Sequence, residues 1–158
     1  MISYFLFEQP WLSTALLVAF TIVGPFVGIY LAERPLIAWL ASGLSLAPVI
    51  LLTFIPYPRP ISTRCTFQWS LPTPGQAELM ANVILFAVPA LLFCVASQRA
   101  AVVWAAAVGL SVVTEMTQAL VPETGRSCDA SDVLSNAIGA AIGVCLGIAS
   151  WKLRPTVV

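Results

Sequence analysis

Long apolar stretches separated by short polar segments dominate the pattern along this chain. A helix needs about 20 mainly apolar residues to cross a bilayer. Five stretches reach that length: Trp11 to Ala32, Leu36 to Ile55, Leu79 to Ser97, Ala101 to Val121, and Asp132 to Trp151. The sequence therefore predicts an all-α fold, a polytopic transmembrane helix bundle with five spans.

The composition agrees with a membrane protein. Of the 158 residues, 59% are hydrophobic and 9% are charged, whereas about 25% are charged in a typical soluble domain. The segment before the first stretch contains Glu8 but no Lys or Arg, so it lacks the basic start of a secretory signal peptide. We expect this first stretch to remain in the protein as a span.

The basic residues predict an orientation. With five spans, one side of the membrane receives Arg34, Arg99, Lys152 and Arg154, and the other receives Arg59, Arg64 and Arg126. The positive-inside rule places the larger group in the cytoplasm, which gives an outside N-terminus, a cytoplasmic C-terminus and a multi-pass location in the bacterial inner membrane. The chain has no net charge and no basic cluster, which argues against nucleic acid as a partner.

Two of the four cysteines fall in the two outward loops. Cys65 lies in a proline-rich segment from about Pro56 to Glu78, and Cys128 lies before the last stretch. A disulfide between them is one interpretation for an oxidising exterior, and two unrelated thiols are the other. The sequence has no histidine and no zinc-like cysteine spacing, so we expect no metal site of that kind.

Polar residues gather around the last two stretches. Glu115 and Gln118 share one helical face, and Ser111 lies one turn earlier on it. An ionisable group within a span usually faces the bundle interior or a water-filled cavity, so Glu115 should point inward. Its expected partner is Arg126, the basic residue of the second outward loop.

Asp129, Asp132 and Asn136 mark the start of the fifth stretch. Asp129 fits an N-cap, and Asp132 fits an acidic first-turn residue that interacts with the helix dipole. A purely structural role is thus one interpretation of both carboxylates. The other is a functional polar stripe, because Asn136 follows Asp132 by one turn and continues the polar face into the membrane.

Small residues follow this stripe. Gly139, Gly143 and Gly147 recur every four residues, which is typical of a helix face that another helix approaches closely. The spacing leaves open whether that helix is internal or belongs to a second subunit. In the third stretch, Asn82 and Pro89 indicate an inward polar contact and a kink.

These residues together resemble the VanZ-like family of small membrane proteins, which is named after a protein linked to teicoplanin resistance. The matching positions are Asn82, Ile84 to Phe86, Pro89, Glu115, Gln118, Gly125 to Ser127, Asp129, Asp132, Val133, Asn136, Gly139 and Gly143. The resemblance implies a four-helix core over residues 36–151, an additional N-terminal helix over 1–35, and a short cytoplasmic tail over 152–158. It implies no established reaction and no catalytic residue.

One departure from the family pattern limits the chemistry. Many members carry an Asp-Lys pair and a His near the first core helix, whereas this chain has no His and no Lys before Lys152. A mechanism that requires a histidine is therefore excluded.

The leading hypothesis is a bacterial cell-envelope protein with no or weak catalytic activity, whose outward polar pocket binds an anionic lipid or a lipid-linked cell-wall precursor and influences teicoplanin susceptibility. The expected pocket residues are Glu115, Gln118, Arg126, Asp129, Asp132, Asn136 and Asn82. No cofactor is expected, although the carboxylates could hold a divalent cation. The alternatives are an intramembrane enzyme acting on a lipid-linked substrate, and a structural accessory subunit that binds a protein partner or a second copy through its glycine face.

Overall fold

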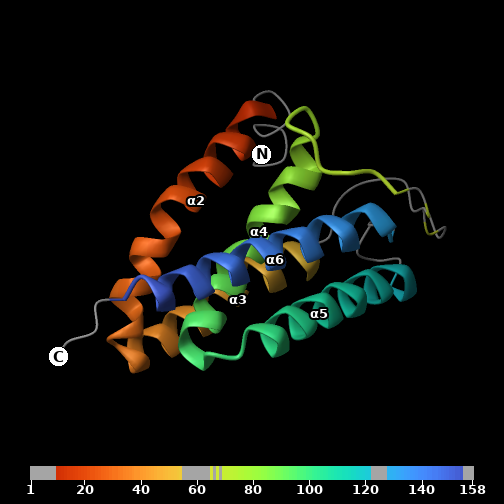
Figure 1. The fold of residues 1–158 in the computed structure, drawn as a ribbon. Helices are drawn as coiled ribbons and strands as arrows, with labels where there is room; N and C mark the ends of the chain where they lie inside the picture. The colour runs from red at the N-terminus through yellow and green to blue at the C-terminus, as the bar shows by residue number, and fades with distance from the viewer. Residues whose placement is uncertain (1–9, 55–64, 66, 68, 122–127, 155–158) are drawn as a thin grey trace.

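A computed structural model describes residues 10–54, 65, 67, 69–121 and 128–154. It contains five long α-helices, labelled in Figure 1: α2 (Pro10–Ala32), α3 (Pro35–Phe54), α4 (Ala77–Ser97), α5 (Ala100–Leu120) and α6 (Ala130–Lys152). All five are long and apolar enough to cross a membrane. The predicted all-α bundle of five spans is confirmed, and every helix begins and ends within two residues of its predicted bounds.

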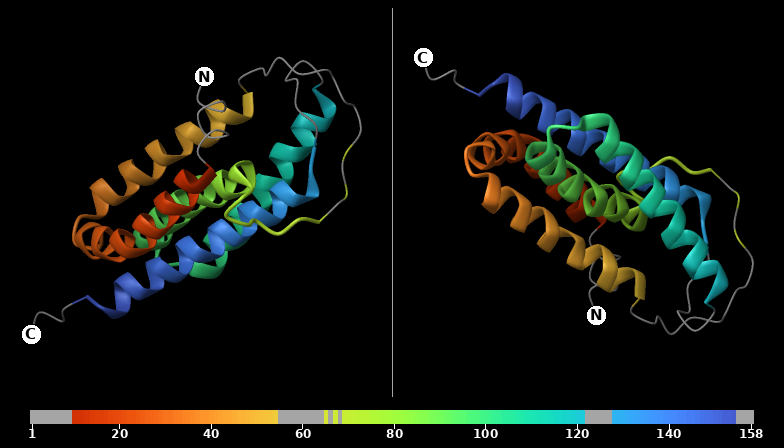
Figure 2. Two further views of the ribbon diagram at one scale, coloured as in Figure 1. Left: turned by 90° about the horizontal axis from the view of Figure 1, so that it is seen from above. Right: turned by 90° about the horizontal axis from the view of Figure 1, so that it is seen from below.

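Helix α4 lies at the centre of the bundle. It packs most extensively against α6 and also contacts α2, α3 and α5. Figure 2 shows α4 between α3 on one side and α6 on the other. Its fully buried residues include Val83, Ala87 and Leu91, so its small and branched side chains form the core on which the outer helices pack.

The glycine face of α6 lies directly on α4 of the same chain. A Cβ atom at Gly139 would overlap the carbonyl oxygen of Val83, and one at Gly143 would overlap that of Ala87. At Gly147 a Cβ would come within 2.8 Å of the Cys94 side chain. The spacing left open whether the helix that packs on this face is internal or belongs to a second subunit. In this structure it is α4 of the same chain.

The two ends of the bundle differ in their connections. At one end, here called the turn end, α2 joins α3 at Glu33 and Arg34, and α4 joins α5 at Gln98 and Arg99. Gln98 ends α4 in the left-handed conformation at φ 56°, and its N–H bonds to the Cys94 carbonyl oxygen at 2.9 Å, a common helix C-terminus.

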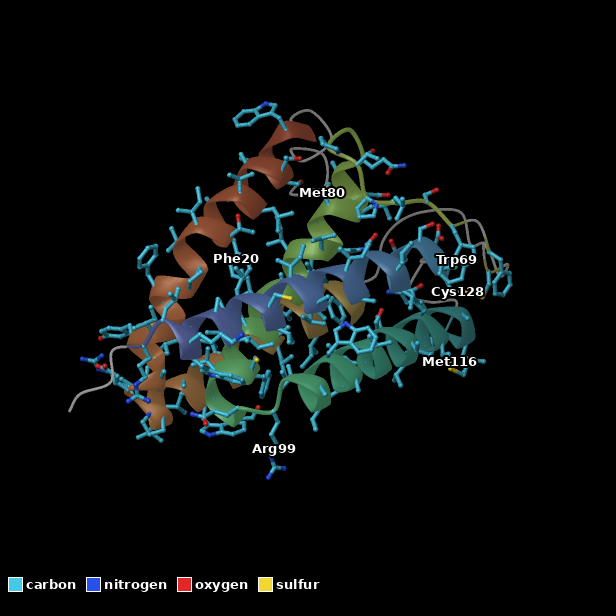
Figure 3. The ribbon with its side chains drawn as sticks, in the orientation of Figure 1. Phe20, Trp69, Met80, Arg99, Met116 and Cys128 are labelled. Atoms are coloured by element: carbon cyan, nitrogen blue, oxygen red, sulfur yellow. A yellow bond between two sulfur atoms is a disulfide. The ribbon has the colours of Figure 1, made fainter. Side chains whose placement is uncertain are left out.

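The opposite end, here called the loop end, is where α3 and α5 end and where α4 and α6 begin. A disulfide between Cys65 and Cys128 links the α3–α4 connection to the residues that precede α6. The Ser70 N–H also bonds to the Ser131 hydroxyl at 3.1 Å. Figure 3 shows Trp69 and Cys128 at this end and Arg99 at the turn end.

Candidate functional site

A layer of polar side chains joins α4, α5 and α6 near the loop end. Asn82 on α4 donates a hydrogen bond from Nδ2 to Oδ1 of Asp132 on α6 at 2.7 Å. Asp132 lies in the first turn of α6, where the free backbone amides favour a carboxylate. The helix start and the Asn82 amide therefore both stabilise this acidic group within a span.

One turn deeper, Asn136 on α6 bonds to α5. Its Nδ2 donates to the Ser111 hydroxyl at 2.8 Å, and both residues are buried, with Asn136 4% exposed. Its Oδ1 is also buried and has no hydrogen-bond partner among the described residues. A buried acceptor without a donor costs about 1–3 kcal/mol, so this oxygen is an energetically unfavourable point within the polar layer.

Glu115 ties α5 to the start of α6. Its Oε2 accepts a hydrogen bond from the backbone N–H of Asp129 at 2.8 Å. Asp129 is the N-cap of α6, and its own carboxylate accepts from the Ser131 N–H at 2.8 Å. The Asp129 carboxylate thus caps the helix. Glu115 is buried beside the polar layer, with 7% of its surface exposed.

These side chains surround a cavity of about 110 Å³. Its polar wall comes from α4, α5 and α6, and consists of Asn82, Thr114, Glu115, Gln118, Asp132 and Asn136. Its apolar wall comes from α3 and α4, and consists of Val49, Leu52, Leu85 and Phe86. A water molecule takes up about 30 Å³ in the liquid, so the space fits a group about the size of glycerol.

The structure brings together five of the seven residues expected in the pocket, namely Asn82, Glu115, Gln118, Asp132 and Asn136. Asp129 lies next to them as the helix cap but does not line the cavity. Arg126, the expected partner of Glu115, lies outside the described residues. Gln118 is 7% exposed, and within the described part of the chain its amide makes no hydrogen bond to another residue, so it is available to a ligand.

The acidic groups of the site are few and lie among amides. Within the described residues, no three His, Cys, Asp or Glu side chains come together as metal ligands. The cavity wall contains two carboxylates, Glu115 and Asp132, together with three amide side chains. Such a wall is suited to hydrogen bonding with hydroxyl or ammonium groups.

Comparison with known proteins places this architecture in a family. The family model described as VanZ/LLP1 matches residues 11–151, nearly the whole chain. The chain belongs to the VanZ/LLP1 family. No curated protein and no solved structure matches it significantly.

The VanZ/LLP1 match agrees with the resemblance inferred from the motif residues, and it extends over α2 as well as over the four helices from α3 to α6. The chain is thus a multi-pass membrane protein of the VanZ/LLP1 family. All seven expected pocket positions lie within the matched range.

Some residues of the site were not apparent from the sequence. The apolar wall of the cavity includes Val49 and Leu52, which look like ordinary membrane-facing residues in a uniformly apolar stretch. Ser131 was also missed, although its hydroxyl receives the Ser70 N–H. A serine two residues after an N-cap aspartate carries no periodic signal that would single it out.

Proposed function

We propose that this VanZ/LLP1 protein acts in the bacterial cell envelope by binding the polar headgroup of an anionic lipid or of a lipid-linked cell-wall precursor in the cavity at the loop end. The observation that carries the proposal is the buried Asn136 Oδ1, which has no donor among the described residues and belongs to a residue of the cavity wall. A headgroup hydroxyl would supply that donor.

The other polar groups of the wall support the same ligand. Gln118 can both donate and accept hydrogen bonds, and the carboxylates of Glu115 and Asp132 accept them. The hydroxyls of a glycerol or sugar headgroup can form hydrogen bonds with such a set within about 110 Å³. We assign the phosphate of the ligand to Arg126 by its chemistry, because a guanidinium binds phosphate through paired hydrogen bonds.

The loop end would open to the exterior in the orientation expected from the basic residues, because Arg34, Arg99 and Lys152 all lie at the turn end. A headgroup held there would belong to the outer leaflet. Binding of a cell-wall precursor on this side would change its exposure to glycopeptides, and we propose on this basis that the protein influences teicoplanin susceptibility.

Mass spectrometry of co-purifying lipids tests the binding proposal. The wild-type protein should retain one lipid class above its abundance in the membrane, and Asn136→Leu should lose that enrichment because it replaces the polar atoms with a side chain of similar size. Thr117→Val is the matched control, since the Thr117 hydroxyl bonds to its own helix at the Val113 carbonyl oxygen, 2.8 Å away, and lies outside the cavity wall.

Equal lipid profiles for wild type, Asn136→Leu and Thr117→Val, in samples with the same helical content, would instead favour a structural role of the polar layer. The susceptibility proposal is measured separately, as the teicoplanin concentration that stops growth of cells producing each variant. Wild type and Thr117→Val should agree, and Asn136→Leu should resemble cells without the protein.

A further inference from the structure

An apolar groove runs along α4 from the polar cavity toward the turn end. Its volume is about 420 Å³. It lies between α3 and α5, with α4 as its floor, and its wall includes Trp39 and Leu46 on α3, Phe86 and Phe93 on α4, and Ala106 on α5. It reaches Ser97 and Arg99 at the turn end.

The groove exists because α3 and α5 pack on different partners. Helix α3 packs mainly on α4, and α5 packs mainly on α6, so the packing between α3 and α5 is slight among the described residues. Small residues line the α5 side at Ala106 and Ala107. Because α3, α4 and α5 are all long and apolar enough to cross a membrane, the groove opens toward hydrocarbon.

The polar cavity and the apolar groove are adjacent. Val49 and Phe86 line both of them. Phe86 lies one helical turn from Asn82, whose amide contributes to the polar wall. An amphipathic molecule with its polar group beside Asn82 and Asn136 would therefore have its apolar part next to the groove at Phe86.

The walls and the neighbourhood of the groove decide its occupant. Between Phe86 and Ser97 the groove follows α4 for about 16 Å, at 1.5 Å per residue. Its walls are almost entirely apolar, and its near end adjoins the polar cavity. A lipid, which joins a polar headgroup to a hydrocarbon chain, matches these two adjoining spaces.

We infer that this groove holds a hydrocarbon chain of the same lipid whose headgroup occupies the polar cavity. The inference rests on the proposed function and adds to it a binding site for the tail, so that the protein contacts both the headgroup and a chain of one membrane lipid. Hydrocarbon in the groove is no more apolar than hydrocarbon in the bilayer, so selection of the tail comes from the fit of the groove walls.

Blocking the groove without touching the cavity tests this inference. Ala106→Phe places a ring in the groove, and Ala105→Phe is the matched control, because Ala105 is its neighbour on α5, is exposed, and does not line the groove. The probe is a membrane lipid extract from the producing cells, and the readout is the lipid retained per protein after purification. Ala106→Phe should reduce the enriched lipid about tenfold, equivalent to about 1.4 kcal/mol, while Ala105→Phe should retain it.

Comparison of Ala106→Phe with Asn136→Leu separates the headgroup proposal from the tail proposal. Loss of the enriched lipid in both variants supports both proposals. Loss in Asn136→Leu alone overturns the tail groove and leaves the headgroup site standing. Loss in Ala106→Phe alone, or in neither variant, overturns the headgroup site together with the inference that one lipid occupies both spaces. Equal helical content and equal monodispersity of the variants establish that each comparison concerns folded protein.

Discussion

Asn82 and Asp132 lie fifty residues apart in the sequence and form a 2.7 Å hydrogen bond between α4 and α6. Coupling between these residues is the first prediction. Asn82→Ala, Asp132→Ala and the double variant should give a coupling free energy of about 1–2 kcal/mol. The measurement is unfolding in mixed micelles with increasing SDS, followed by circular dichroism. Strictly additive effects would show that this hydrogen bond contributes nothing to stability.

Glycine-to-alanine substitutions on α6 and α5 should separate the effect of close packing on stability from the effect of helix propensity. Gly139→Ala places a Cβ against the Val83 carbonyl oxygen, and we expect it to lower the free energy of unfolding by about 1–3 kcal/mol. Gly109→Ala on α5 is the control, because an added Cβ there meets no atom within 4 Å. That variant should be neutral or more stable by up to about 1 kcal/mol. Similar losses at both positions would contradict the packing described for α6.

The disulfide should be detectable as protected thiols. The chain has four cysteines, of which Cys94 and Cys145 are free. Maleimide labelling of the denatured protein should modify two thiols before reduction and four after it. Removing the bridge by Cys65→Ser should destabilise the protein by about 4 kcal/mol, from the 63-residue separation of the two cysteines. Four reactive thiols in protein purified without reductant would contradict the bridge.

Two substitutions of Asp129, the N-cap residue of α6, should destabilise the protein to different degrees. Asp129→Ala removes the acceptor for the Ser131 N–H and should cost about 1 kcal/mol, whereas Asp129→Ser retains an acceptor and should cost less. Both variants keep the backbone N–H that donates to Glu115. Since Asp129 does not line the cavity, Asp129→Ser should also retain the lipid enrichment of the wild type. Loss of that enrichment would place the Asp129 carboxylate among the ligand contacts.

The basic residues predict an orientation in the membrane that can be measured with fusions. With Lys152 and Arg154 in the cytoplasm, a fluorescent protein fused to the C-terminus should fluoresce, and alkaline phosphatase fused there should be inactive. The same phosphatase fused after Thr73, in the α3–α4 connection at the loop end, should be active. The reverse pattern would place the polar cavity on the cytoplasmic side.

Helix bounds could be predicted closely because the bilayer imposes them. Each span must keep an apolar stretch of about 20 residues, and breaks such as Glu33-Arg34 and Gln98-Arg99 interrupt that pattern sharply. The grouping of Asn82, Glu115, Asp132 and Asn136 could also be predicted, because polar side chains within spans face one another rather than lipid.

Features that depend on the fit between helices could not be predicted. The glycine period on α6 requires a close partner but does not specify α4. The groove depends on α3 and α5 packing on different neighbours, and apolar residues such as Trp39 and Ala106 look the same in sequence whether they face lipid, a groove or another helix. The position of the Asp129 carboxylate in a cap, rather than in the cavity wall, likewise depends on where α6 begins.

The contact between α4 and the glycine face of α6 has a consequence for biosynthesis. Helix α4 emerges from the ribosome well before α6, so its Val83 and Ala87 backbone remains uncovered in the membrane until the last helix is made. The Asn82 amide likewise cannot form its hydrogen bond to Asp132 until α6 is made. Chains that stop before α6 would therefore leave the most closely packed face of their central helix without its partner.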